Sequence, residues 1–277
     1  MLNKYLLLIS LLIINISSAQ EYLEQQYELA KNLYEKENYF DAITEFKRLI
    51  FFDLNNNYAF QSNEYIAQCY KQGGIYDEAV QYFTLAEINT KNDGDLYRIK
   101  VEIIRTNILR RTTDNAIKLL DELERNERWS NNKSEISYWR GWAFIFADEW
   151  DKAAEEFLKI SSNHELKLLC EGTQEKKYSV TFAKIASIIL PGAGQFYTGN
   201  YLSGFLSIGW CTLWGYIAVN AFIEERIFDG LVVGNFLWLR FYKGNLQNAE
   251  KFAEEKNIEI ANESFYYLQN SYKGLKP

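Results

Sequence analysis

The chain has 277 residues, of which 48% are hydrophobic and 16% aromatic, and its formal net charge is −7 at pH 7. Residues 20–165 hold 18 Lys or Arg and 27 Asp or Glu, a net charge of −9. A domain this acidic is repelled by nucleic-acid phosphates and by anionic lipid headgroups. We therefore expect no nucleic-acid partner, and a domain that stands off the bilayer.

The residue types that usually carry catalysis or bind metals are scarce. The sequence has one histidine, His164, and three cysteines, Cys69, Cys170 and Cys211, which are far apart. This pattern argues against a disulfide framework or a zinc site. No Ser/His/Asp set and no cluster with metal-ligand spacing occurs in the sequence. We expect no enzyme, no cofactor, no metal and no small-molecule substrate.

The first residues follow the pattern of a secretory signal peptide. Lys4 gives a positive start, residues 5–16 form an apolar stretch, and Ser17-Ser18-Ala19 supplies small residues. We predict a signal peptide at residues 1–19 that is removed after Ala19. The alternative is an uncleaved anchor helix, for which the stretch is short. In either case the signal would direct Glu21 onward across the membrane.

A spacing of 37 residues recurs between residues 20 and 165. An alanine stands at each interval and a large apolar residue follows four positions later. These core positions are Ala42, Ala79, Ala116 and Ala153, with Phe46, Phe83, Leu120 and Phe157. The positions twelve residues before the alanines are Ala30, Ala67, Ile104 and Gly141, and those three before are Tyr39, Tyr76, Thr113 and Trp150.

These offsets predict a helix, a turn and a second helix in each unit. A spacing of four places the alanine and the large side chain on one helix face. The positions twelve residues earlier belong to a preceding helix, where small side chains allow close approach. Asp77, Asp114 and Asp151 would cap or charge-stabilise three of the second helices. Candidate groove residues on the first helices are Gln26, Asn63, Arg98 and Ser137.

The pattern resembles the tetratricopeptide repeat. The resemblance rests on L-A-x-x-L-Y at residues 29–34 with Y-F-D-A-I-T-E-F at 39–46, and on similar runs at 66–83 and 141–157. The period is three residues longer than the usual 34 of that family, and its proline is absent. The resemblance implies four repeats in residues 20–165, stacked into a solenoid with a concave groove for protein partners. The alternative is a structural spacer that binds nothing.

After an expected linker at residues 166–178, the composition becomes that of a membrane protein. Residues 185–223 contain no Asp, Glu, Lys or Arg, which is long enough for two passes or for one pass with a re-entrant leg. Residues 202–223 form the clearest span, and 227–242 a third apolar segment. We expect a membrane domain at residues 179–243 with two to three apolar segments.

A glycine-rich turn divides the apolar run. Its residues, together with two that follow the third apolar segment, are Pro191, Gly192, Gly194, Gln195, Tyr197, Gly199, Gly244 and Asn245. The turn lacks a Walker-type lysine and follows no strand, so we interpret it as a site of helix packing in lipid. Gln195 or Asn220 could donate hydrogen bonds across such a contact.

This half resembles small bacterial membrane proteins with a P-G-x-G-Q-x-Y-x-G turn, and a broader family with two transmembrane helices. The resemblance covers residues 179–253 and implies a membrane domain. We expect this domain in the bacterial inner membrane, with the repeats on the periplasmic side to which the signal peptide would direct them. Residues 244–277 are expected to form a polar, amphipathic tail with one or two helices. Three crossings would place this tail in the cytoplasm, and two would keep it beside the repeats; we favour three segments.

The expected function follows from these parts. We predict an all-α protein, a tetratricopeptide-like solenoid followed by transmembrane helices, which acts as a membrane-anchored scaffold for protein–protein interaction. The alternative is a membrane-embedded transport or protein-insertion factor that uses the repeats as its substrate receptor. Gln195, Tyr197 and Asn220 would then line a polar path.

Overall fold

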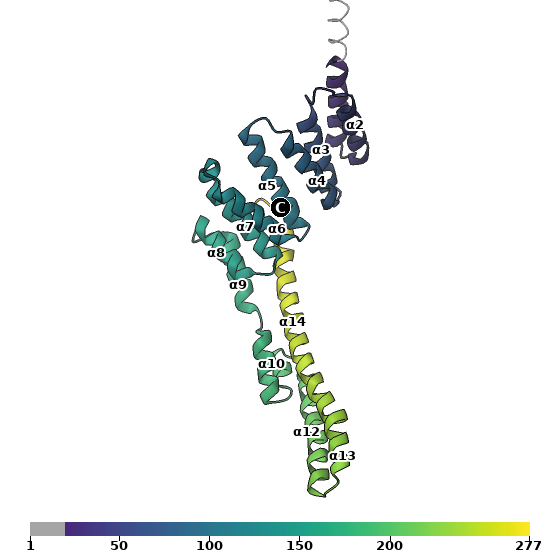
Figure 1. Ribbon diagram of the computed structural model, residues 1–277. Coiled ribbons are helices and arrows are strands. Elements are labelled where there is room, and N and C mark those ends of the chain that lie inside the picture. Colours follow the sequence, from purple (N-terminus) through teal and green to yellow (C-terminus); the bar gives the residue numbers. More distant parts are fainter. Residues whose placement is uncertain (1–19) are drawn as a thin grey trace, which may run out of the picture. The chain divides into compact units, whose positions relative to one another are not determined.

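The computed structural model describes residues 20–277, and every regular element among them is helical (Figure 1). The all-α expectation is thus confirmed for the described part of the chain. The predicted signal peptide at residues 1–19 lies outside it. The structure forms two compact units. The first comprises the described residues up to Lys167 together with Leu275–Pro277, and the second comprises Leu168–Gly274.

The first unit is a series of helices in which each packs on the next. Its helices are residues 20–35, α2 (Tyr39–Phe52), α3 (Ala59–Gln72), α4 (Tyr76–Ile88), α5 (Asp93–Leu109), α6 (Thr113–Arg125), η1 (Glu127–Asn132), α7 (Lys133–Phe146), α8 (Trp150–Ile160) and the start of α9 (Glu165–Lys176). The contacts run from α2 to α8 in chain order, and α5 also touches α7. This is the packing expected of helix pairs placed one after another.

The turns inside the four pairs repeat the spacing of 37 residues in their backbone. A residue with positive φ stands at the same place in each: Glu37 (60°), Gly74 (73°), Arg111 (61°) and Asp148 (63°). In each, the following amide donates back to the carbonyl five residues earlier, as in Ile75 N to Tyr70 O at 2.9 Å. This is the Schellman arrangement, which ends a helix by satisfying its last carbonyls. Only one of the four left-handed positions is glycine, so the sequence pattern concealed this regularity.

Replacing glycine at one of these turns and introducing it at another should change the free energy of unfolding in opposite directions. A Cβ at Gly74 would meet no atom within 4 Å, so Gly74→Ala tests backbone conformation alone. We expect it to lower the free energy of unfolding by about 1 kcal/mol, and Glu37→Gly to raise it by a similar or smaller amount. Urea unfolding of the full chain in detergent measures both. Equal signs for the two variants would contradict the turn geometry.

The core of the first unit consists of the residues that define the repeat. The four alanines and the four large residues after them are all 0% exposed: Ala42, Ala79, Ala116, Ala153, Phe46, Phe83, Leu120 and Phe157. Each second helix begins at the position three residues before its alanine, at Tyr39, Tyr76, Thr113 and Trp150. The burial of these positions explains why the spacing is visible in the sequence.

The small residues on the first helices are required by space. A Cβ built on Gly141 would lie 2.5 Å from Cζ of Phe157, whose ring covers this point of α7. Alanine normally stabilises a helix by about 0.5–1 kcal/mol relative to glycine. Here we expect Gly141→Ala to destabilise the protein by about 1–3 kcal/mol, because the ring must move. Gly141→Ala/Phe157→Leu should recover part of the loss in urea unfolding, and a stabilising Gly141→Ala would contradict the packing.

The predicted aspartate caps are absent from the described helices. None of the residues that precede α4, α6 and α8 accepts a side-chain-capping hydrogen bond, and Asp77, Asp114 and Asp151 lie in the first helical turn instead. A carboxylate there still interacts favourably with the helix dipole. Of the two roles proposed from the sequence, charge stabilisation is the one that this position permits.

The segment expected as a linker, residues 166–178, is largely helical. It holds most of α9, because Leu166, Cys170 and Thr173 recur at helical spacing and are buried. Burial also raises the pKa of the Cys170 thiol to about 12, and that of Cys69 likewise. Both thiols are therefore protonated at neutral pH and act as small apolar side chains.

The second unit contains α10 (Val180–Ile189), α11 (Ala193–Tyr197), α12 (Tyr201–Ile223), α13 (Ile227–Val232), the π-helical segment η2 (Val233–Trp238) and α14 (Leu239–Asn270). The last three join without a break, so helical structure runs from Ile227 to Asn270. No helix boundary therefore marks the start of the tail expected at residue 244, and the second tail helix from Ile260 is part of α14. Among the described residues one helix, α12, is long and apolar enough to cross a membrane.

Candidate functional site

The glycine-rich turn and Asn245 meet in one buried junction of the second unit. Asn245 on α14 accepts from the Gly192 amide at 2.7 Å and donates to the Ser187 carbonyl at 3.1 Å. Gln195 on α11 donates from Nε2 to the Asn245 carbonyl at 2.9 Å and to Asn245 Oδ1 at 3.1 Å. The side chains of Ser187 and Gln195 are 0% exposed, and Asn245 is 2% exposed.

Two serines that the sequence reasoning missed complete this polar junction. Ser187 Oγ accepts from the Gly194 amide at 2.8 Å and donates to Gln195 Oε1 at 3.2 Å. Ser207 Oγ on α12 accepts from Gln195 Nε2 at 3.3 Å. Single serines inside apolar helices gave no pattern that could have identified them. Together the residues tie α10, α11, α12 and α14 to one another.

Glycine is favoured at the positions of the turn for different structural reasons. Gly192 has a φ of 93°, and a Cβ there would lie 2.5 Å from the Gly204 carbonyl oxygen. A Cβ on Gly194 would lie 2.3 Å from the Ala183 carbonyl oxygen. Gly199 has a φ of 79° with open space around it, so its backbone conformation alone favours glycine. Nothing within 4 Å of Gly244 explains a glycine at that position.

The remaining motif residues lie around the junction. Pro191 follows the last residues of α10, where it ends the helix. Tyr197 Oη accepts from the Ser179 amide at 3.1 Å, and its ring makes edge contacts with Tyr178 and Phe182. These contacts hold the N-terminus of α10 in place, which is a packing role.

The residues of the predicted polar path are not brought together. Asn220 donates to Glu224 at 2.9 Å on its own helix, and lies thirteen residues beyond Ser207. At 1.5 Å per residue this is roughly 20 Å along α12 from the polar junction. The side chain of Gln195 has its hydrogen bonds satisfied within the junction. The junction is therefore built to hold helices together.

The candidate groove on the first unit differs in composition from the prediction. Gln26, Asn63 and Ser137 are 7%, 6% and 6% exposed, so these three are buried instead of facing a partner. Gln26 donates to Glu45 Oε2 at 2.5 Å, and Asn63 donates to the Ala59 carbonyl at 2.6 Å. Only Arg98 of the four candidates is exposed to solvent. The helical spacing identified the right helices but placed the exposed face wrongly.

The face that the first helices do expose is hollowed and charged. We call it the first-helix face and define it by Tyr34, Glu64, Lys71, Arg98 and Arg105. One cavity of about 540 Å³ is lined by residues 27–34, α3 and α5. A second, of about 370 Å³, is lined by α3, α4, α5 and Pro277. Gln68 lines both, so the two hollows adjoin along α3.

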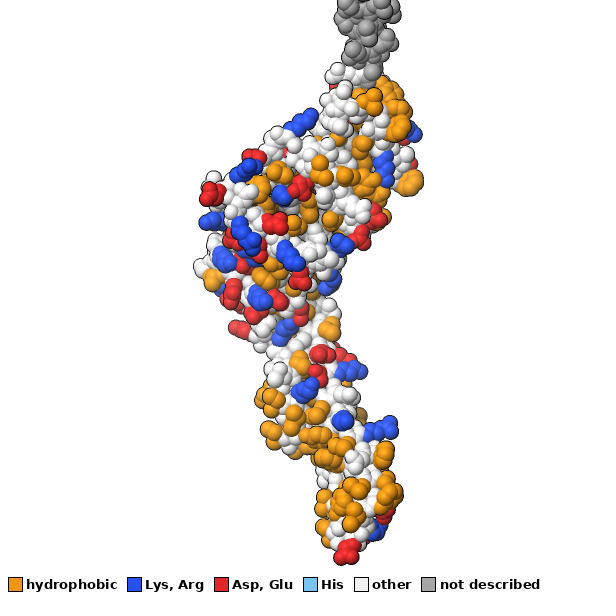
Figure 2. All heavy atoms as spheres, in the orientation of Figure 1, with side chains coloured by type: hydrophobic (Ala, Val, Ile, Leu, Met, Phe, Trp, Pro, Cys, Tyr) orange, Lys and Arg blue, Asp and Glu red, His pale blue; other side chains and the backbone are white. Residues whose placement is uncertain are grey.

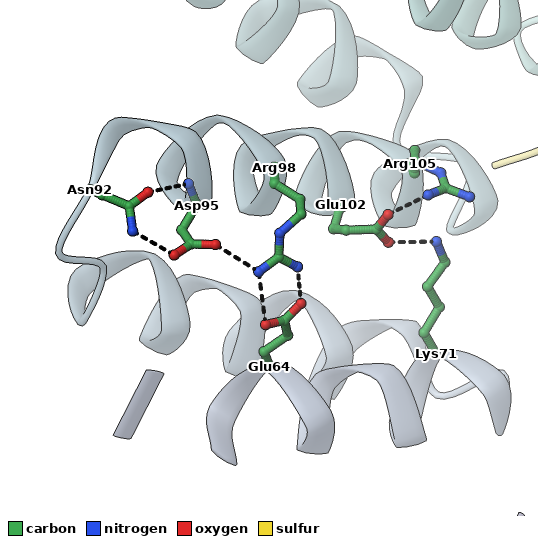
Figure 3. A network of polar contacts seen from close by, with 7 residues as sticks. All are labelled: Glu64, Lys71, Asn92, Asp95, Arg98, Glu102 and Arg105. Carbon is green, nitrogen blue, oxygen red and sulfur yellow. Dashed lines mark hydrogen bonds and ion pairs between the residues drawn. The ribbon is translucent and has the colours of Figure 1, made fainter. Parts of the chain in front are cut away.

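Two ion networks order the side chains of this face (Figure 3). Arg98 pairs with both oxygens of Glu64, and its Nη2 donates to Asp95 Oδ1 at 3.0 Å. Asn92 donates to Asp95 at 2.7 Å and caps α5, and these hydrogen bonds with Arg98 hold the pKa of Asp95 below its usual value. These hydrogen bonds and ion pairs hold positively and negatively charged side chains next to one another on the first-helix face.

The second network is formed by Glu102 and Arg105, which follow Arg98 on α5 by four and seven residues, and by Lys71 on α3. Glu102 accepts from Lys71 Nζ at 3.0 Å and also pairs with Arg105. The Arg105 guanidinium lies 4.9 Å from the centre of the Trp139 ring. Burial lowers the pKa of Lys71, an effect that Glu102 partly opposes. Both cations are thereby held in fixed positions.

A further cavity of the first unit, about 610 Å³, lies between α4, α5 and α6. A Lys100–Glu87 ion pair of 2.6 Å sits in its wall beside Ile103 and Leu119. Among the described residues no group of three or more His, Cys, Asp or Glu could hold a metal ion. His164 stacks on Phe157 with ring centres 5.1 Å apart, which is a packing role.

The second unit exposes an apolar surface. The exposed side chains on α12 include Leu202, Phe205, Trp210, Tyr216 and Ile223, and those beyond it include Phe228, Leu231 and Phe236. Figure 2 shows hydrophobic side chains over this hairpin, with charged ones gathered at its tip. At the tip, Arg226 pairs with both Glu224 and Asp229.

Comparison of the chain with protein-family models, with curated proteins and with solved structures found no match. A proposal for the function of the protein therefore rests on its fold and its sites.

Proposed function

We propose that this protein is a membrane-anchored scaffold whose tetratricopeptide-like repeats hold a protein partner at the bacterial cell envelope. The single observation that carries the anchor is the exposure of α12, of which only 17% of the apolar window is buried in the protein. A core helix of a soluble protein would bury such a surface, since burial gives about 25 cal/mol per Å². Lipid is the environment that this surface fits.

The lengths of the helices favour two crossings. The 23 residues of α12 extend about 35 Å, which is enough for the roughly 30 Å of hydrocarbon. The ten residues of α10 extend about 15 Å, too short to cross. The proposed return leg is the helical stretch from Ile227, which continues to Asn270 and is therefore not limited in length as α10 is. Asp229 lies near its start, and the long side chain of Arg240 within it would extend toward headgroups. With two crossings, the residues before and after the hairpin are on the same side, which the predicted signal peptide would make periplasmic.

Cysteine labelling tests this arrangement. In intact cells a membrane-impermeant maleimide should label Lys36→Cys in the first unit but not Glu225→Cys at the hairpin tip, unless the inner membrane is opened. The three native cysteines are buried and give a low background. Release of the chain by alkaline carbonate, or labelling of Glu225→Cys without permeabilisation, would contradict the two-crossing anchor.

The partner is expected to bind the first-helix face. This face offers adjoining hollows and preset charges of both signs, which suit a polar or amphipathic protein segment. Crosslinking in the envelope should recover fewer partner molecules with Glu64→Ala/Arg98→Ala than with the native chain. The matched control is Glu149→Ala/Lys152→Ala, which removes an exposed pair on α8. Equal capture by the two double variants would remove the first-helix face as the partner site.

A further inference from the structure

The last three residues of the described chain lie in the first unit. Leu275–Pro277 group with the repeat helices, although 107 residues of the second unit, 168–274, precede them. Figure 1 marks this end of the chain among the helices of the first unit. The segment follows α14 and forms no helix. It is therefore a non-helical segment that contacts the helices of the first unit.

Its contacts are made through the main chain. Arg105 Nη2 on α5 donates to the Lys276 carbonyl at 2.8 Å, and Tyr138 Oη on α7 donates to the Leu275 carbonyl. The Leu275 side chain itself is 69% exposed. Two successive carbonyls are thus held by two successive first helices. Such recognition depends on an extended backbone more than on side-chain identity.

Pro277 continues the same line toward α3. It lines the 370 Å³ cavity of the first-helix face together with Lys71, Arg105, Tyr76 and Leu109. Relative to the positions 67, 104 and 141 of the 37-residue repeat, Lys71, Arg105 and Tyr138 lie at +4, +1 and −3. Each donor is about one helical turn earlier than the last, so the three share a helix face and form a diagonal row.

Arg105 and Lys71 are also held by residues of the first unit itself. Arg105 is held between Glu102 and the Trp139 ring, and the Lys71 side chain is 9% exposed against Glu102. Preset donors reduce the entropy lost on binding. The face is therefore suited to accept an extended segment without rearrangement.

We propose that Leu275–Pro277 are an intramolecular ligand of the first-helix face and compete with the partner segment for it. The inference rests on the proposed function only in taking that face as the partner site. The partner chemistry that it implies is an extended peptide whose carbonyls accept from Arg105 and Tyr138. Its chain direction runs from α7 toward α3, and the neighbouring 540 Å³ cavity, lined by Tyr27, Phe60 and Tyr65, lies further along α3.

The docking of the tail is tested without any partner. A benzoylphenylalanine photocrosslinker replaces Gln72, which is exposed and lines the cavity beside Pro277. In the full chain in detergent, irradiation and tryptic digestion should yield a crosslink to the peptide 274–277, which trypsin leaves intact at Lys276-Pro277. The same group at Glu155, exposed on α8, should give none. A Gln72 sample without this crosslink, or with it only between two chains, would overturn the docking.

Competition is tested with a defined probe. A fluorescent peptide of residues 268–277, capped at both ends, is titrated into the full chain and into a variant that lacks residues 275–277. We expect at least a tenfold lower Kd for the variant, and loss of that gain when Arg105→Ala and Tyr138→Phe are added. Equal Kd values with an intact crosslink would overturn competition while leaving the scaffold function standing. Loss of partner capture by Glu64→Ala/Arg98→Ala remains the separate test of that function.

Discussion

Arg140→Leu is expected to lower the free energy of unfolding of the first unit by about 3–5 kcal/mol, the range for breaking a buried ion cluster from one side. The Arg140 side chain is 7% exposed on α7, and its Nη2 lies 2.7 Å from Glu124 and 3.0 Å from Asp121. Glu156 of α8 lies 3.8 Å from Nη1 and is 9% exposed. Without the guanidinium, three carboxylates from two helices face a site with too little positive charge.

Matched variants separate this effect from lost packing. Arg140→Leu/Glu156→Gln should recover a large part of the stability, because it removes the most buried negative charge. Arg98→Leu, at a site 47% exposed, should cost no more than about 1 kcal/mol. Urea unfolding with hydrogen exchange on α7 and α8 measures all three. A loss for Arg140→Leu as small as that for Arg98→Leu would show that the cluster contributes little.

Asn245→Leu is expected to destabilise the packing of α10 and α11 against α14 in the second unit. It removes the acceptor of the Gly192 amide and a donor to the Ser187 carbonyl, at a site 2% exposed. Each orphaned buried group costs about 1–3 kcal/mol. We expect α10 and α11 to separate from α14, seen as protease cleavage near residues 190–200 in detergent.

A double-mutant cycle assigns the effect to the junction. Gln195→Leu and Asn245→Leu should be strongly non-additive, because each removes partners of the other. Asn220→Leu is the control on α12, since its partner Glu224 is exposed. If Asn220→Leu disturbs function as much as Gln195→Leu while both remain folded, the polar path regains support over the packing role.

The sequence predicted those features that local spacing determines. The 37-residue interval identified the buried alanines and the first residue of each second helix, because a stacked helix pair must repeat its contacts at a fixed distance. The motif around Gln195 was found through its glycines, of which Gly192 and Gly194 make close contacts that exclude a Cβ and Gly199 has a positive φ. The reason for their recurrence, Asn245 about fifty residues later, became visible only in space.

Other features depend on contacts that no local pattern records. Ser187 and Ser207 are single polar residues in apolar helices. Gln26, Asn63 and Ser137 were expected in the groove but are buried, because helical spacing fixes relative face and not which face meets solvent. The sequence left two or three apolar segments open, and the ten-residue length of α10 favours the two-crossing hairpin that we propose. The position of Leu275–Pro277 has no counterpart in hydrophobic periodicity.

Because of the order of the two units along the chain, the first-helix face is synthesised before Leu275–Pro277, which contact it. The residues of the first unit up to Lys167 are synthesised first, and the 107 residues 168–274 must follow before Leu275 is made. During that interval the carbonyls of Leu275 and Lys276 are not yet available to Tyr138 and Arg105. If the proposed competition holds, a partner that binds before Leu275–Pro277 are synthesised would meet a surface without this segment, whereas a later one would have to displace it.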